Sequence, residues 1–375
     1  MATGRIVIRA DSGLDIGTGH VMRCLTLADA LRDQGAEVVF VTRRHKGHVI
    51  PALTGRGHRV VILPGNTGVS YGAHPAPPAH AGWLGAAWSE DAAATRRVLD
   101  AEGADWLVMD HYALDREWQQ AALTAGTRLL VVDDLADRPH MADILLDQNA
   151  GRQAADYNGL VPDDCDRLIG PTHALLRAEF AQSRSEALAR RDSLSRPERL
   201  LITLGGIDKT NVAATVLEAL AASPVAAGFE ITVIMGGSAP WLEEVQSRAA
   251  CMPMPTEVAI DVANMAQHMT RADLCIGAAG STAWERCTLG LPTLQVVLAD
   301  NQMAAASYMD KHGLALALPF PDAPDFASAV SKGLEHLSQR DTYRTMAHRA
   351  AALTDGEGTG RLAHQLIDRE PLHAH

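Results

Sequence analysis

The stretch RIVIRADSGLDIGTGHVMRCLTLADALRDQG, residues 5–35, joins a short apolar run, a glycine-containing turn and an amphipathic segment. The run 5–10 is rich in Val and Ile, which is typical of a buried strand. The segment 20–33 predicts a helix, because its apolar side chains recur at 3.6-residue spacing: Val21, Cys24, Leu25, Ala28 and Leu31. Gly35 suits the end of that helix. The stretch therefore predicts a strand–turn–helix unit.

The same alternation continues along the chain and restarts after residue 197. Further strands are expected at 37–42, 59–63, 105–109, 128–132, 143–147, and then at 199–204, 230–235, 257–260, 273–276, 293–297 and 314–318. Near-continuous apolar runs of this length are typical of parallel strands that helices cover on both faces. Helices are expected in the second half at 209–222, 240–249, 281–289, 301–312 and 324–337. The pattern predicts an α/β protein with two doubly wound, Rossmann-like domains.

We expect the domains to span 1–175 and 198–345, and the charged segment 176–197 to form a surface helix that leads into the linker between them. A length of 375 residues agrees with two domains. The formal net charge of −12 disfavours nucleic acid as a partner, since phosphate backbones usually need a basic face. No apolar run approaches the roughly 20 residues of a membrane span, and no secretory leader is evident. We expect a soluble, cytoplasmic protein without a membrane partner.

Glycine-rich turns follow three of the expected strands in the second half. They contain Gly205 and Gly206, then Gly236 and Gly237, and then the sequence GAAGSTAWE at 277–285. Ligands of open α/β sheets bind beyond the carboxyl ends of strands, and glycine lets a phosphate approach the backbone. We expect a ligand at 277–285 and a purely structural turn at 236–237. The first pair suits either role equally.

The sequence at 282–285 has two interpretations. Thr282 and Glu285 have the spacing of a helix capping box. Alternatively, a diphosphate binds the backbone N–H groups at Ser281 and Thr282, which leaves Glu285 to accept hydrogen bonds from ribose hydroxyls. Both interpretations place the start of a helix here.

The glycines before the first helix resemble a dinucleotide-binding fingerprint only in part. Gly17 and Gly19 have the spacing of its first two glycines, but Met22 occupies the third position. The second strand runs into Thr42 and lacks the acidic residue that binds ribose. We therefore expect Gly17 and Gly19 to make room for a ligand and His20 to act as a general base. The alternative is that His20 merely begins a helix.

Carboxylates follow several strands of the first half. Asp11, Asp110 and the pair Asp133–Asp134 come directly after apolar runs, and Asp110 continues into His111 and Tyr112. Strand ends converge at one edge of a parallel sheet, so we expect these side chains, with Asp11 facing the substrate, near one site. Adjacent aspartates in an extended strand point to opposite faces, and no third ligand is evident. We therefore expect neither a metal nor a cofactor, and the cysteines lack the paired spacing of a zinc site.

Six blocks, in the same order, resemble the UDP-2,4-diacetamido-2,4,6-trideoxy-β-L-altropyranose hydrolases of pseudaminic acid biosynthesis. They are RADSGLDIGTGHVMRCLTLADAL (9–31), WLVMDHYALDREW (106–118), LLVVDDLADRPHMADILLDQN (129–149), GPTHALLRAEF (170–180), LLITLGGID (200–208) and GAAGSTAWERCTLGLPTLQVVLADNQ (277–302). The resemblance covers roughly residues 5–345. The last block also resembles the glycosyltransferases of the GT-B fold that make lipid II.

The resemblance implies a GT-B fold, in which two Rossmann-like domains face each other across a cleft and the second binds UDP. It implies hydrolysis of a UDP-linked 2,4-diacetamido-2,4,6-trideoxy sugar by water attack at the anomeric carbon, with inversion and with His20 as the base. Tyr112, Asn301 and Gln302 would line the sugar site. UDP would be bound by Gly205, Gly206, Val262, Ser281, Thr282 and Glu285. A final helix, 359–370 within 346–375, would cross back onto the first domain.

Two other functions are compatible with the sequence. One is a GT-B glycosyltransferase that moves the sugar of a UDP-sugar to an acceptor, although no basic or apolar patch suits a lipid acceptor. The other is a non-catalytic sensor of nucleotide sugars. The proline-rich segment 72–82 suits a surface insertion better than a substrate lid. The oligomeric state is left open, with a monomer among the options.

Overall fold

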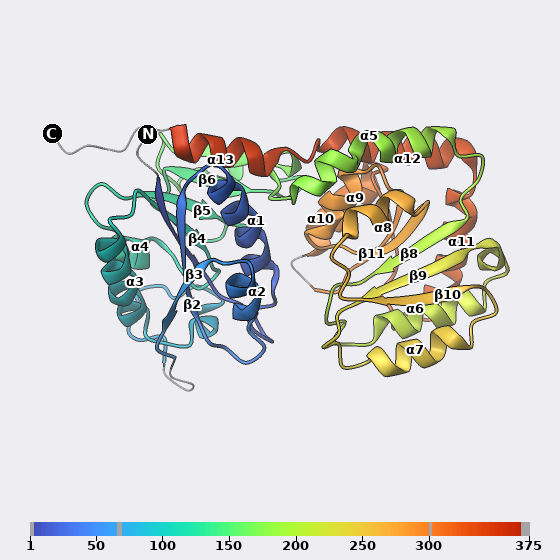
Figure 1. Ribbon diagram of the computed structural model, residues 1–375, viewed down its shortest axis with the longest axis horizontal. Helices are drawn as coiled ribbons and strands as arrows, with labels where there is room; N and C mark the ends of the chain where they lie inside the picture. The colour runs from blue at the N-terminus through green and yellow to red at the C-terminus, as the bar shows by residue number, and fades with distance from the viewer. Residues whose placement is uncertain (1–3, 66–69, 300–301, 369–375) are drawn as a thin grey trace. The chain divides into compact units, whose positions relative to one another are not determined.

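The computed structural model describes residues 4–65, 70–299 and 302–368. The chain forms two compact units: unit 1 comprises Met1–Leu176 with Glu357–His375, and unit 2 comprises Arg177–Gly356. Each unit is a parallel sheet with helices on both faces (Figure 1), as the sequence predicts for the fold class. The segment 176–197 forms a helix, as expected, but this helix, α5 (Ala178–Ser193), belongs to unit 2, which therefore begins earlier than expected. Unit 2 also extends to Gly356, beyond the expected end at residue 345.

Unit 1 is built on a seven-stranded sheet in which all neighbours are parallel, in the order β3-β2-β1-β4-β5-β6-β7. The strands are β1 (Arg5–Ala10), β2 (Glu37–Arg43), β3 (Arg59–Leu63), β4 (Trp106–Asp110), β5 (Arg128–Val132), β6 (Ile144–Asp147) and β7 (Asp166–Ile169). The order reverses between β1 and β4, and ligands of such sheets bind beyond the carboxyl ends of the strands at this switch point.

Side chains that alternate along the strands of unit 1 fill two cores. Ile6 and Ile8 contribute to the core that includes residues of α1 (Gly19–Asp33) and α13 (Gly358–Asp368). Val7 contributes to the core on the opposite face, with residues of α3 (Trp88–Glu102) and α4 (Arg116–Ala122). The short helix α2 (Ile50–Gly55) precedes β3. Trp106 of β4 donates from Nε1 to the carbonyl of Leu366 at 3.0 Å, which ties α13 to the sheet.

Unit 2 is built on a six-stranded parallel sheet in the order β10-β9-β8-β11-β12-β13. The strands are β8 (Arg199–Thr203), β9 (Glu230–Met235), β10 (Thr256–Ile260), β11 (Leu274–Ala278), β12 (Thr293–Val296) and β13 (Leu316–Ala317). The strand order reverses between β8 and β11. Two of the three expected glycine-rich turns lie at the carboxyl ends of these two strands: Gly205 and Gly206 follow β8, and the sequence 277–285 contains the end of β11 and the turn after it.

Helices cover both faces of this sheet (Figure 1). One core includes residues of α6 (Val212–Ala221), α7 (Leu242–Ala250) and α11 (Phe326–Leu337). The other includes residues of α5 and α8 (Met265–Arg271), and α9 (Thr282–Thr288) packs beside α5 and α12 (Arg340–Leu353). The remaining helix is α10 (Met303–Lys311).

The described part of the proline-rich segment is an extended loop that ends in a short 3₁₀ turn, Ala81–Leu84. Two bonds attach its flanks to unit 1. Tyr71 donates its hydroxyl to the carbonyl of Ala113 at 2.6 Å, and Trp88 donates from Nε1 to the carbonyl of Ala73 at 2.9 Å. Its His80 ring lies 5.4 Å from the ring of Tyr112, measured between centroids.

Candidate active site

The turn between β1 and α1 closes on itself before it reaches His20. Gly13 and Gly17 exchange backbone hydrogen bonds of 3.2 and 2.8 Å, and Gly17 has a φ of 81°, which favours glycine. Gly19 begins α1, and a Cβ added there would meet no atom within 4 Å. A Cβ on Gly17 would also meet no atom within 4 Å, so Gly17 is favoured by its backbone conformation alone and Gly19 by neither conformation nor packing. The turn places His20 at the second residue of the helix.

His20 is paired with a carboxylate from the end of β4. Its Nδ1 lies 2.6 Å from Oδ1 of Asp110, and both side chains are buried. Burial by itself would raise the pKa of Asp110, but Arg23 and His20 hold this pKa well below its usual range. An ionised carboxylate only accepts hydrogen bonds, so Nδ1 carries a proton; in the neutral form of an imidazole held this way, Nε2 is the nitrogen with the lone pair. Within the described residues, no hydrogen bond occupies Nε2.

Arg23, one helical turn after His20, joins two carboxylates. Its Nε and Nη2 donate to the two oxygens of Asp110 at 2.6 and 2.7 Å, and its Nη1 donates to Oδ2 of Asp134 at 2.7 Å. Its Nη2 also lies 3.3 Å from Nδ1 of His20. The guanidinium thus fixes the carboxylate that orients the imidazole.

Asp134 also holds Tyr112 and Asn149. The Tyr112 hydroxyl donates to Oδ2 of Asp134 at 2.8 Å, and Nδ2 of Asn149 donates to Oδ1 at 3.1 Å. The Tyr112 ring meets the His20 ring edge-on, with centroids 4.5 Å apart. Burial and the Asp134 charge raise the pKa of Tyr112 well above its usual value, so its hydroxyl stays protonated. The structure therefore brings the expected residues His20 and Tyr112 together.

Asp11 does not have the position that we expected for a substrate contact. Its side chain is fully buried, and Arg9, the Thr42 hydroxyl and the Arg43 backbone N–H donate to it at 2.7–3.0 Å. A ring nitrogen of His45 and one of His111 each lie 3.3 Å from its Oδ2. These groups surround the carboxylate, so Asp11 connects the start of the β1–α1 turn to the neighbouring strands instead of facing a ligand.

In unit 2 the turn after β8 contacts the turn after β9. Gly205 has a φ of 91°, and the carbonyl of Gly206 accepts a 3.0 Å hydrogen bond from the N–H of Gly236. A Cβ on Gly236 would lie 2.4 Å from that carbonyl oxygen, so only glycine fits. This close approach gives Gly236 a structural role, whereas a Cβ on Gly205 or Gly206 would point into open space.

The predicted capping box at the start of α9 is not formed. Thr282 is the first helical residue, Ser281 precedes it, and no side chain caps the helix. Arg286, which sequence reasoning missed, holds this turn instead: it donates to the Thr282 hydroxyl at 3.1 Å and to the Ala278 carbonyl at 2.7 Å. Its guanidinium lies so close to Gly277 that an added Cβ would be 2.6 Å from Nη1.

Glu285, in the first turn of α9, does not cap the helix and lies near a cation instead. Its Oε1 lies 3.6 Å from Nη2 of Arg177, and burial raises its pKa although Arg177 and Arg286 oppose the change. Gln302 accepts from the Leu298 N–H at 3.0 Å, and its Nε2 would lie 3.5 Å from a Cβ on Gly280. Val262 packs against the core of unit 2 after β10. Asn301 lies outside the described residues.

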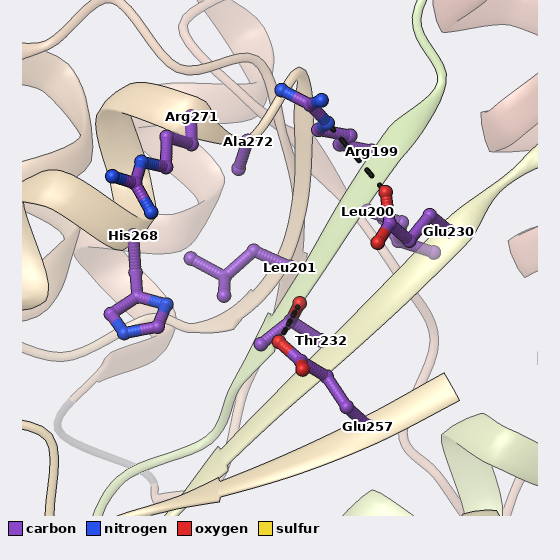
Figure 2. Close-up of a pocket in the computed structure, with 9 residues that line it drawn as sticks. All are labelled: Arg199, Leu200, Leu201, Glu230, Thr232, Glu257, His268, Arg271 and Ala272. Atoms are coloured by element: carbon purple, nitrogen blue, oxygen red, sulfur yellow. Dashed lines mark hydrogen bonds and ion pairs between the residues drawn. The ribbon is translucent and has the colours of Figure 1, made fainter. Parts of the chain in front are cut away.

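Two cavities lie at opposite ends of the unit 2 sheet. One, of about 410 Å³, is at the carboxyl ends of the strands, lined by Thr210, Val212, Thr215, Val297, Leu298, Ala299, Phe320, Pro321 and Asp322. The other, of about 370 Å³, includes the first residues of β8 and β9 (Figure 2). There, Arg199 pairs with Glu230 at 3.6 Å and Thr232 donates to Glu257 at 3.0 Å. Ligands of such sheets bind at carboxyl ends, which favours the first cavity and the turns beside it.

In residues 4–65, 70–299 and 302–368 no three His, Cys, Asp or Glu side chains are grouped as a metal site would need. Over the same ranges, no helix combines the length and apolar character that a membrane crossing requires.

Sequence comparison confirms the resemblance that the motifs indicate. Residues 200–361 match the model of the glycosyltransferase family 28 C-terminal domain. The chain is 26% identical over 310 residues to the UDP-2,4-diacetamido-2,4,6-trideoxy-beta-L-altropyranose hydrolase of Campylobacter jejuni, covering 82% of this chain and 97% of that protein. It is also 25% identical over 199 residues to the spore coat polysaccharide biosynthesis protein SpsG of Bacillus subtilis, covering 53% and 57%.

Solved structures share the fold. The MurG structure of Acinetobacter baumannii superposes with a TM-score of 0.71 at 17% identity, covering 98% of this chain and 100% of that one. The two parallel-sheet α/β units are thus those of GT-B glycosyltransferases, as expected. Together these comparisons support an enzyme.

Proposed function

We propose that the protein hydrolyses a UDP-linked 2,4-diacetamido-2,4,6-trideoxy sugar to UDP and the free sugar. The observation that carries the proposal is the buried His20–Asp110 pair, whose 2.6 Å contact leaves Nε2 of the imidazole free to accept a proton. The likeness to the Campylobacter jejuni hydrolase supports the choice of substrate.

In the proposed reaction, Nε2 of His20 takes a proton from water as the water oxygen bonds to the anomeric carbon. The bond from that carbon to the UDP oxygen breaks, and its electron pair leaves with UDP. Attack from the face opposite the leaving group inverts the configuration. Asp110 then faces an imidazolium, which its negative charge stabilises.

Unit 2 is proposed to bind the nucleotide. Backbone N–H groups around Gly205, Gly206, Ser281 and Thr282 would contact the diphosphate and stabilise its charge as the bond breaks. Glu285 would accept hydrogen bonds from the ribose. The backbone near Val262 would contact the uracil, and Gln302, beside the glycine-rich turn, would contact the sugar.

The test is incubation of the protein with a panel of UDP-diacetamido sugars and no acceptor. We expect stoichiometric UDP and free sugar, with ¹⁸O from labelled water in the sugar; label in UDP would mean cleavage of a P–O bond and would contradict the mechanism.

His20→Ala should lower the rate by about 10²–10⁴. His364→Ala, on the exposed side of α13, is the matched control and should not change it.

A glycosyltransferase is the second candidate, because the domain match at 200–361 and the MurG-like fold are found in that class. The same assay separates the two functions. A transferase would release little UDP until an acceptor is added, and a sensor would bind the nucleotide sugar without releasing UDP.

A further inference from the structure

Arg23 is the buried cation nearest to the proposed base. It follows His20 by one helical turn on α1, and only 9% of its side chain is exposed. Three of its guanidinium nitrogens reach oxygens of Asp110 and Asp134, and one of them lies 3.3 Å from Nδ1 of His20. It therefore sits where its charge affects both the imidazole and the carboxylate that orients it.

The groups around His20 carry opposing charges. Two carboxylates contribute negative charge, Asp110 from β4 and Asp134 from the loop after β5, and Arg23 contributes a positive charge between them. Four other titratable groups lie nearby. Burial raises the pKa of the Cys24 thiol and of Tyr112, and it lowers the pKa of His111, which lies against Asp11. The Arg138 guanidinium lies over the Tyr112 ring, 5.9 Å from its centroid, and pairs with Asp133. The charges in direct contact with His20 or with its partner Asp110 are thus one guanidinium and the carboxylates that it joins.

This balance bears directly on proton transfer. Negative charge beside an imidazole favours imidazolium, and imidazolium cannot accept a proton from water. Without the guanidinium, both carboxylates would act on the ring with their full charge. With it, Asp110 keeps the hydrogen bond that orients Nδ1 while most of its charge is neutralised.

We infer that Arg23 is a positioning residue that keeps His20 in its proton-accepting form by neutralising Asp110 and Asp134. The inference rests on the proposed function and adds a residue that acts through His20 without touching the substrate. It requires that the two kinds of charge have opposite effects. Loss of the Arg23 charge should extend the pH range over which His20 is protonated, and loss of the Asp134 charge should narrow it.

The experiment compares Arg23→Gln, Arg23→Lys and Asp134→Asn. For each, kcat/KM for the UDP-diacetamido sugar is measured from pH 5 to 9. Relative to the unmodified protein, we expect the acidic limb of Arg23→Gln to move up by about one pH unit or more. Without the guanidinium the carboxylates are no longer neutralised, and a partner of charge opposite to imidazolium shifts its titration by about one to three units. Asp134→Asn should move the limb down. Arg23→Lys keeps the charge and should restore the limb nearly to its original pH, although kcat falls because the forked contact with Asp110 is lost.

A second readout does not depend on the reaction. Proteins with ¹³C-labelled histidine are titrated by NMR without substrate, and the His20 signal is assigned by its loss in His20→Gln. Its midpoint should rise in Arg23→Gln and fall in Asp134→Asn. If Arg23→Gln does not fold, Asp134→Asn should still give a lower midpoint and Arg23→Lys a nearly unchanged one.

The outcomes separate the two proposals. Shifts of equal sign in Arg23→Gln and Asp134→Asn, or lower rates in these two variants with unchanged pH limbs and midpoints, would overturn the role of Arg23 and leave a purely structural residue. Opposed NMR shifts in a protein that releases no UDP would support the role of Arg23 and overturn the proposed hydrolase.

Discussion

Nδ1 of His20 and Oδ1 of Asp110 lie 2.6 Å apart although 90 residues separate them in the chain. The β1–α1 turn supplies the histidine and the end of β4 supplies the carboxylate. Since β1 and β4 are neighbours at the switch point of the unit 1 sheet, their carboxyl ends meet. The contact sets which ring nitrogen carries the proton, and the first prediction tests that assignment.

Asp110→Asn should lower kcat by about 10²–10⁴, because an amide can donate to Nδ1 and so leave the proton on Nε2, where the base is needed. Circular dichroism and gel filtration should show a folded protein. Glu102→Gln, which weakens an ion pair with the exposed Arg59 at the start of β3, is the control and should retain its rate. A folded Asp110→Asn variant with an undiminished kcat would refute the role given to this pair.

The end of β11 and the turn after it contain two glycines, Gly277 and Gly280, with different surroundings. In Gly277→Ala the new Cβ would collide with the buried guanidinium of Arg286, at 2.6 Å from Nη1. Displacing Arg286 removes its bonds to Thr282 and Ala278, so we expect a loss of about 1–3 kcal/mol in the free energy of unfolding. Denaturant unfolding measures this loss, and an unchanged midpoint would contradict it.

Gly280→Ala should leave stability nearly unchanged, since the nearest atom to an added Cβ is 3.5 Å away. We instead expect its affinity for UDP to fall by about tenfold or more, because a methyl group would occupy space that a phosphate needs beside the backbone. Isothermal titration calorimetry with UDP gives the affinity. If Gly280→Ala binds UDP like the unmodified protein, the diphosphate does not contact this turn.

The sequence predicts the sheets more accurately than it predicts the contacts. Apolar runs locate strands such as β1 and β9 to the residue, because burial on both faces leaves a continuous signal. Some elements escape sequence prediction, among them β7 and α8. The residues of β7, DRLI, are half-buried and half polar, and α8 has only seven residues. The two-residue β13 is shorter than the apolar run at 314–318.

Side-chain partners depend on strand order, which local patterns do not contain. His20, Asp110 and Asp134 are each visible as polar residues beside strands, but their link through Arg23 needs β1, β4 and β5 to be adjacent. Arg23 has one usable signal, since a cation three residues after a candidate base lies on the same helical face. The capping-box interpretation of 282–285 is wrong for a related reason. The buried Arg286 donates to the Thr282 hydroxyl, and no rule of sequence spacing predicts that contact.

Trp106→Phe should loosen the attachment of α13 to unit 1. The change removes the bond to the Leu366 carbonyl and leaves a small cavity around a residue that is 2% exposed, so we expect a loss of about 1–3 kcal/mol in the free energy of unfolding. Trp241→Phe is a matched control, because its Nε1 also donates to a carbonyl at 3.0 Å but the side chain is 39% exposed. Urea unfolding should separate the two variants, and equal losses would contradict the proposed attachment.

Asp147 should make stability depend on pH in the direction opposite to most aspartates. Burial and the nearby charge of Asp134 raise its pKa to about 6. Its Oδ2 accepts from Tyr157 at 2.9 Å, and the same hydroxyl lies 3.0 Å from Asp133, so one phenolic proton is offered to two carboxylates. As the pH rises, the folded protein therefore keeps a proton on Asp147 that an unfolded chain releases at about pH 3.9.

Because the folded state binds more protons between these two pH values, the contribution of Asp147 to stability is largest below about pH 4. It falls as the pH rises to about 6 and is constant above that. Asp147→Asn cannot titrate, so subtracting its free energy of unfolding from that of the unmodified protein isolates the effect. We expect this difference to fall by on the order of 2–3 kcal/mol between pH 4 and 7. Urea unfolding at half-unit pH steps measures it, and a difference that rises with pH would mean that Asp147 is an ordinary, well-compensated carboxylate.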